Sequence, residues 1–322
     1  MYRVRYLAVL SAFALSAGSV SAQTTRTWIG APGGDWSLGG NWEPAGEPQA
    51  GDHVIINNGA AVLLTNTTAA LTSCLLTNAT LTVANWDTVV QANTVTIENG
   101  GIITLPGPFD EGAMSNRIQI VCVDFRLDAG GVLDADGMGY NPGHGLGKGA
   151  TGDSRQSGGG YGGRGGDAGK DYRRTAIGGS PYGSAMEPVD PGSGGGIVST
   201  LNGPGGGAVR IVADDTATID GIISANGTPA TRSCGSGGSI LMETTTLAGT
   251  GSLLARGGTP GTISEYWNPG GGGRIALHYV EVAPLTALTI DTRPGQHGWP
   301  FIVVDDIEDR WMYRADLGTI WM

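Results

Sequence analysis

The chain alternates short apolar runs with turns, and no long stretch keeps the 3.6-residue apolar period of an amphipathic helix. β-Branched residues dominate the apolar positions, as in the runs 54–56 and 95–97. Between such runs lie turn sequences such as Asn57-Asn58-Gly59, in which Asn and Gly readily adopt positive φ. The pattern predicts an all-β fold built from many short strands.

Three segments repeat the same order of strand, turn, strand and turn, and they close at Gly137, Gly227 and Gly257. A fourth copy starts at Gly273 and then diverges. Many short strands could also form a sandwich, but recurrence of the same turn favours a solenoid, in which each rung pairs with the next. We therefore expect a right-handed parallel β-helix with a glycine-rich loop insertion and a cap at each end.

The register of the repeats places Leu133, Ile223 and Leu253 at equivalent positions, so we expect these side chains on one inward-facing column. The repeats and the composition shifts divide the chain into six segments. We expect a signal peptide at 1–22, a Trp-rich N-terminal cap at 23–52, the first β-helix rungs at 53–137, a glycine-rich loop layer at 138–206, later rungs at 207–290, and a C-terminal tail or cap at 291–322.

The first 22 residues have the three-part layout of a secretory signal. Arg3 and Arg5 precede an apolar run of about ten residues, which is too short to cross a membrane, and small residues end the segment at Val20-Ser21-Ala22. Cleavage leaves Gln23 first, which is not the cysteine of a lipoprotein. We expect an extracellular or cell-surface protein without a transmembrane segment.

The charge balance is acidic, with 18 Lys and Arg residues against 29 Asp and Glu residues and a net charge of −11. Loss of Arg3 and Arg5 with the signal peptide makes the net charge −13. Phosphates would be repelled, and no basic stripe overcomes that repulsion. The sequence therefore argues against nucleic acid as a partner.

Glycine supplies 58 of the 322 residues, but 40% of the chain is apolar, so a core can form. Four tyrosines within 138–206 favour an ordered, tightly packed glycine layer over a flexible linker. The three cysteines indicate no disulfide framework. Cys74 and Cys122 lie among apolar residues and should be buried, whereas Cys234 lies in a Gly/Ser loop and should be exposed.

Two stretches resemble known proteins. The segment from Trp28 to Val54, with Gly34-Asp35-Trp36 and Asn41-Trp42, resembles the opening repeat of large bacterial extracellular β-solenoid proteins and of some autotransporter passenger regions. Glycine runs such as 161–166 and 271–273 resemble those of glycine-rich surface proteins that carry such solenoids. The resemblance implies a β-helix outside the cell and leaves the activity open.

One turn is a candidate calcium site. Asp134 and Asp136, followed by Asn141, resemble the start of a calcium loop, because Ca²⁺ needs several oxygen ligands in a tight turn. The equivalent turn at Ser224-Ala225-Asn226-Gly227 has no carboxylate, so a purely structural turn is the alternative. Calcium is the one cofactor that the sequence suggests.

Candidate ligand-binding residues fall into two groups. Trp36 and Trp42 could offer aromatic faces to a sugar, or they could cap the first rung. Arg164, Arg173 and Arg174 concentrate positive charge in the glycine-rich stretch, where they could bind an acidic sugar or form local salt bridges.

The sequence suggests no catalytic residues. Neighbours on a strand point to opposite faces, so the adjacent pairs Asp214-Asp215 and Asp305-Asp306 are poor acid and base partners. The four histidines lack metal-ligand spacing. We expect a secreted or cell-surface structural or binding module that contacts polysaccharide or extracellular matrix. The alternative is a carbohydrate-active enzyme, a polysaccharide lyase or glycoside hydrolase, on a β-helix scaffold.

Overall fold

A computed structural model describes residues 23–111, 116–152, 155–170, 173–197, 202–261, 268–296 and 315–322. The expected signal peptide, residues 1–22, and the pair Asp305-Asp306 lie outside these ranges. Within them the chain is all-β, with one short 3₁₀ turn, η1 (Gly39–Asn41). The described residues contain no helix that is long and apolar enough to cross a membrane.

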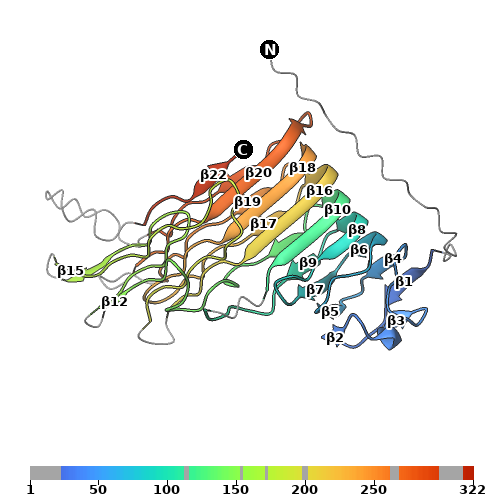
Figure 1. The fold of residues 1–322 in the computed structure, drawn as a ribbon, viewed down its shortest axis with the longest axis horizontal. Coiled ribbons are helices and arrows are strands. Elements are labelled where there is room, and N and C mark those ends of the chain that lie inside the picture. Colours follow the sequence, from blue (N-terminus) through green and yellow to red (C-terminus); the bar gives the residue numbers. More distant parts are fainter. Residues whose placement is uncertain are drawn as a thin grey trace, which may run out of the picture.

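Two large sheets form the body of the molecule (Figure 1). Sheet A has ten strands: β1 (Thr25–Trp28), β3 (Trp42–Glu43), β4 (His53–Ile56), β6 (Leu71–Leu76), β8 (Val90–Ile97), β10 (Ile118–Leu127), β16 (Ala208–Ile219), β18 (Ser239–Ala248), β20 (Arg274–Val282) and β22 (Thr319–Trp321). Sheet B has eight: β2 (Gly34–Asp35), β5 (Ala61–Leu64), β7 (Ala79–Val83), β9 (Gly101–Thr104), β11 (Val132–Asp134), β17 (Ile222–Ser224), β19 (Ser252–Leu254) and β21 (Thr289–Asp291).

From β4 to β22, apart from the small hairpins that lie between β11 and β16, consecutive strands alternate between the two sheets. Sheet A has the order β22-β20-β18-β16-β10-β8-β6-β4-β1-β3, and sheet B the order β2-β5-β7-β9-β11-β17-β19-β21. Neighbouring strands pair in parallel, except that β1 and β3 are antiparallel and make sheet A mixed. Each circuit of the chain therefore adds one strand to the end of each sheet.

The core lies between the sheets as columns of equivalent side chains, because alternate residues of every strand face inward. Leu133 pairs with Ile223 and Ile223 with Leu253, and all three are fully buried, so the predicted inward-facing column is confirmed. Sheet A contributes a matching column of Ile120, Ile211, Met242 and Leu277.

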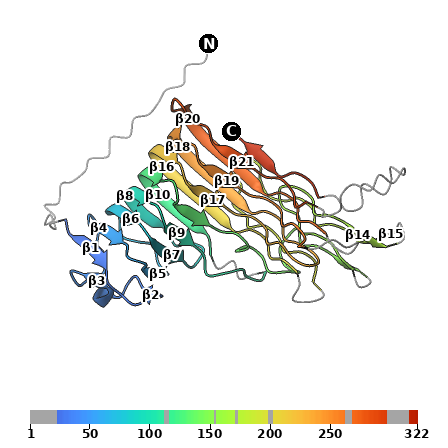
Figure 2. The same ribbon diagram turned by 180° about the vertical axis from the view of Figure 1, so that it is seen from behind.

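The glycine-rich segments lie side by side beyond the ends of the sheet B strands. This region is at the far end of the molecule from β1 (Figure 2). Two short antiparallel hairpins, β12 (Thr151–Gly152) with β13 (Arg155–Gln156) and β14 (Ala168–Lys170) with β15 (Arg173–Ala176), belong to this region. The hydrogen bonds between segments recur at every third residue. The backbone N–H groups of residues 203 and 206 donate to the carbonyl oxygens of residues 233 and 236. In the same way, residues 192 and 195 donate to residues 206 and 203, and residues 234 and 237 donate to residues 268 and 271.

A repeat of three residues is the period of a polyproline II helix, which has no internal hydrogen bonds and therefore bonds to its neighbours. Side chains have no room between such closely packed segments. A Cβ at Gly270 would lie 1.9 Å from the carbonyl oxygen of Gly235, and one at Gly158 would lie 1.9 Å from that of Pro269. The density of glycine in the sequence is thus a packing requirement of this layer.

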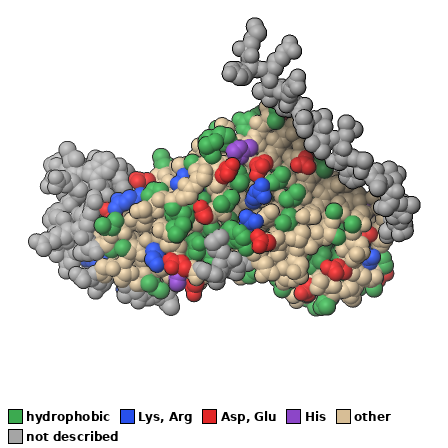
Figure 3. Space-filling view, viewed as in Figure 1, with side chains coloured by type: hydrophobic (Ala, Val, Ile, Leu, Met, Phe, Trp, Pro, Cys, Tyr) green, Lys and Arg blue, Asp and Glu red, His purple; other side chains and the backbone are tan. Residues whose placement is uncertain are grey.

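The surface of the body carries both signs of charge. On the face shown in Figure 3, acidic and basic side chains are interspersed with apolar ones and do not gather into one basic stripe.

All three cysteines are buried and free. The prediction that Cys234 is exposed is wrong, because its Gly/Ser loop is packed inside the glycine layer, where the Cys234 thiol lies 3.9 Å from the carbonyl oxygen of Ala230. Burial raises the pKa of the Cys74, Cys122 and Cys234 thiols to about 12.

We expect none of these thiols to react with a disulfide reagent at pH 8 in the folded protein, because thiolate is the reactive form and burial suppresses it. All three should react after denaturation in guanidinium chloride. Counting reacted thiols spectrophotometrically before and after unfolding tests this, and rapid reaction of one thiol in the native protein would contradict the burial of that residue.

Candidate functional site

The candidate residues Trp36 and Trp42 lie in the segment expected to cap the body, at the edge strands β2 and β3. Trp42 is fully buried and makes edge-on contacts with Trp28 and Trp36, at ring-centroid distances of 5.0 and 4.9 Å. Its indole Nε1 donates a hydrogen bond of 2.7 Å to the carbonyl oxygen of Trp36. Since these rings pack against one another, neither presents an open face to a sugar.

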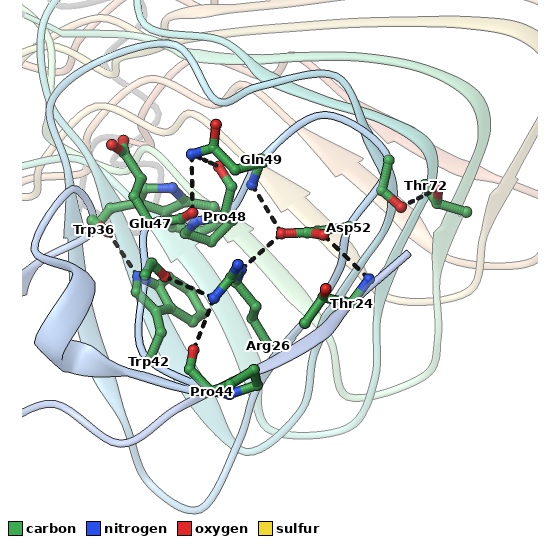
Figure 4. Close-up of polar contacts among 12 residues, drawn as sticks. Thr24, Arg26, Trp36, Trp42, Pro44, Glu47, Pro48, Gln49, Asp52 and Thr72 are labelled. Carbon is green, nitrogen blue, oxygen red and sulfur yellow. Dashed lines mark hydrogen bonds and ion pairs between the residues drawn. The ribbon is translucent and has the colours of Figure 1, made fainter. Parts of the chain in front are cut away.

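An ion pair fixes the cap beside this cluster (Figure 4). Arg26 Nε lies 2.7 Å from Asp52 Oδ2, and the Asp52 carboxylate also accepts from the backbone N–H groups of Gln49 and Thr24. Burial raises the pKa of Asp52, but these hydrogen bonds and the Arg26 charge outweigh burial and lower it. The charged Asp52 carboxylate therefore joins the residues before β4 to the start of β1.

The candidate metal ligands Asp134 and Asp136 form a turn with protein donors. Asp134 Oδ1 accepts from the backbone N–H of Asp136 at 3.0 Å. Asp136 accepts from the backbone N–H of Asn226 at 2.6 Å and from its side-chain amide at 3.0 Å. Burial raises the pKa of Asp136, although the bonds from Asn226 oppose this. Three of the four carboxylate oxygens are thus already hydrogen-bonded.

The third candidate ligand, Asn141, bonds elsewhere. Its side-chain amide donates to Asp110 Oδ1 at 2.9 Å, and the same carboxylate lies 3.4 Å from His144 Nε2. Across the described ranges, no group of three or more His, Cys, Asp or Glu side chains has an arrangement that could hold a metal ion.

Positions equivalent to Asp136 on later circuits carry Asn226, Arg256 and Arg293. Arg256 Nε and Arg293 Nη2 both lie 2.6 Å from Asp291 Oδ2. Hydrogen bonds from Arg293 lower the pKa of Asp291 to about 2, against the effect of burial, with a further contribution from Arg256. Sequence reasoning missed this column, although the repeated turn at 136, 226 and 256 gives its register.

The three arginines that were candidate ligand-binding residues in the glycine-rich stretch lie in two different places. Arg164 forms an ion pair with the buried Asp167, which also accepts from the backbone N–H of Gly178, so Arg164 is held by a local salt bridge. Arg173 and Arg174 lie on β15, where they pair with Lys170 and Gly169 of β14. The adjacent residues Asp214 and Asp215 are exposed. They lie where the pairing of β16 with β18 is interrupted, between Ala213 and Thr216.

A patch where the chain enters β8, β10 and β16 of sheet A brings together residues that sequence reasoning did not select. We call Trp86, Arg117, Gln119 and Arg210 the Trp86 patch. The Arg117 guanidinium lies 4.8 Å from the centre of the Trp86 ring, and Arg117 Nε donates to the carbonyl oxygen of Trp86 at 2.8 Å. The turn at Trp86 lies one circuit before Arg117, as the bridge between Asn85 and Asn116 shows.

Strand alternation places the other two members beside them. Ile118 and Ile120 face the core, so Arg117 and Gln119 face outward, and Gln119 pairs with Arg210 of β16. Arg210 Nη2 lies 2.9 Å from Glu243 Oε1. Only the three-dimensional fold makes this patch, because 80 residues, 128–207, separate β10 from β16 in the chain.

The electrostatics of the patch are those of two close guanidinium groups. Burial lowers the pKa of Arg117, Asp87 raises it, and the charge of Arg210 lowers it again. The Gln119 side chain is 8% exposed, and its Oε1 has no hydrogen-bond partner among the described residues. The patch thus combines a partly exposed aromatic ring, two cations and an unused acceptor.

Comparison with known proteins gives one match. Residues 41–122 match the G8 domain. This domain is found in extracellular proteins, and the matched range covers about a quarter of the chain, from just before β3 into β10, with Trp86, Arg117 and Gln119 inside it. Nothing in the match points to autotransporter passengers in particular. No curated protein and no solved structure matches the chain.

Proposed function

We propose that the chain is a secreted or cell-surface structural and binding module built on a right-handed parallel β-helix. Parallel strands of one sheet are joined through the other sheet, and crossovers between parallel strands of one sheet are right-handed in about 98% of cases. The G8 match supports a place outside the cell.

The observation that carries the proposal is the unbroken pairing of sheet A from β1 to β22 over one continuous core. Such a stack is stiff, because each rung contacts its neighbours along its whole length. Its sheets of ten and eight strands present long outer faces, which suit contact with an extended polymer better than enclosure of a small molecule. We therefore propose polysaccharide or extracellular matrix as the partner.

The proposal is tested with the purified exported protein and a panel of insoluble and soluble polysaccharides. We expect co-sedimentation or retarded migration with at least one polymer and no release of reducing ends or unsaturated products. Failure to bind any polymer or matrix preparation would overturn the proposal.

The same panel, run with and without Ca²⁺, tests the alternative of a carbohydrate-active enzyme and the proposed calcium site at Asp134 and Asp136. The variant carrying both Asp134→Ala and Asp214→Ala is the control. Turnover by the parent that disappears in this variant would establish an enzyme in place of a binding module.

A further inference from the structure

We infer that the Trp86 patch binds an anionic sugar, one that carries a carboxylate or sulfate group, as a unit of the polysaccharide partner. This inference rests on the proposed function and names the ligand class and the residues. Three features of the patch support this inference: the Trp86 ring, the two guanidinium groups and the unused acceptor of Gln119.

The Trp86 ring supplies an apolar surface. Trp86 remains partly exposed although Arg117 lies over its ring. Indole rings with one apolar body and a wet edge are typical of contact surfaces, and the C–H face of a pyranose is a flat apolar partner of similar size. Val121 and Val212, which pair on the outer face of sheet A next to Gln119 and Arg210, extend this surface.

The guanidinium groups select for negative charge. Arg117 uses Nε for Trp86, and its ion pair with Asp87 is 3.8 Å long on a carboxylate that is 95% exposed, so that pair neutralises little. Arg210 donates one hydrogen bond to the Glu243 carboxylate. An arginine has five N–H donors in a planar fork that matches carboxylate and sulfate oxygens. The remaining donors of both residues have no protein acceptor in the described ranges.

Gln119 supplies a fixed acceptor. Gln119 lies two residues after Arg117 and pairs in register with Arg210, and its buried Oε1 has no hydrogen-bond partner among the described residues. Buried acceptors normally find a donor, and a sugar hydroxyl is a donor of the right kind. The patch therefore offers donors for an anion and an acceptor for a hydroxyl group beside one aromatic ring, which a neutral polymer or a simple anion would use only in part.

The test measures affinity of the purified exported protein for three probes: alginate oligosaccharides, which carry carboxylates, dextran sulfate, and neutral dextran. We expect binding to one or both anionic probes and at least about tenfold weaker binding to dextran. Whichever anionic probe is preferred identifies the charged group. Equal affinity for dextran would overturn the inference.

Three variants address the residues. Trp86→Ala and Arg210→Gln should each weaken binding of the preferred probe about tenfold, and Gln119→Leu should weaken it without lowering the melting temperature. Arg126→Gln is the matched control, because Arg126 lies on β10 at an outward-facing position, its side chain is 62% exposed, and among the described residues its ion pair is with Asp128. It should change affinity less than about twofold.

A purely structural role for the patch predicts a different result. In that case the Trp86 and Arg210 variants would lower the melting temperature and leave the affinity of the folded protein unchanged. Binding of the panel polymers that survives all three substitutions would overturn this inference and leave the proposed function standing. A parent that binds no polymer would overturn both.

Discussion

Gly270→Ala is expected to cost about 3 kcal/mol of folding free energy, the upper end of the usual cost of overpacking. The added Cβ would lie 1.9 Å from the carbonyl oxygen of Gly235 and 2.5 Å from its carbonyl carbon. Gly270 donates to Gly258 and accepts from Gly295, so the segment cannot move away without losing hydrogen bonds on both sides. For a chain of this size the melting temperature should fall by roughly 5–10 °C, measured by calorimetry.

Gly261→Ala is the matched control for this substitution. Gly261 lies in the same part of the chain, its φ is not in the left-handed region, and a Cβ there would meet nothing within 4 Å. The control should leave the melting temperature unchanged or raise it slightly, because alanine restricts the unfolded chain. Equal melting temperatures for the two variants would show that the glycine layer is not tightly packed.

Trp42→Ala is expected to destabilise the protein by about 3–5 kcal/mol, the usual cost of truncating a large buried aromatic side chain. Trp42 is fully buried between Trp28 and Trp36, and its removal leaves a cavity and frees the carbonyl oxygen of Trp36. Trp42 lies on β3, the edge strand of sheet A, so the neighbouring strands should lose protection as well. Chemical denaturation with tryptophan fluorescence, together with hydrogen exchange over β1 and β4, measures both effects.

Leu38→Ala provides the control in the same cap, since Leu38 is 59% exposed. It should change the unfolding free energy by less than about 0.5 kcal/mol. If Trp42→Ala were as mild as Leu38→Ala, the tryptophan cluster would not be what stabilises the first rung. Loss of polysaccharide binding in Trp42→Ala at full stability would instead restore the idea that these rings contact a sugar.

The repeats made the columns of the core predictable. The turns closing at Gly137, Gly227 and Gly257 recur at fixed offsets from Leu133, Ile223 and Leu253, and a strand period of two then fixes which side chains face inward. Composition also favoured an ordered glycine layer. Cys234 shows where local sequence misleads, because a Gly/Ser loop is normally exposed but is buried here by other glycine segments.

The candidate sites were predicted less well, for a physical reason. The turn at Asp134 and Asp136 was found because its residues are adjacent in the chain, but its hydrogen-bond partner, Asn226, comes from a later rung. Trp86, Arg117 and Arg210 carry no local motif and meet only because β8, β10 and β16 lie side by side in sheet A. Local periodicity therefore determined the strands, their inward faces and the need for glycine. The pairing of parallel strands about 4.8 Å apart decided which distant side chains became neighbours.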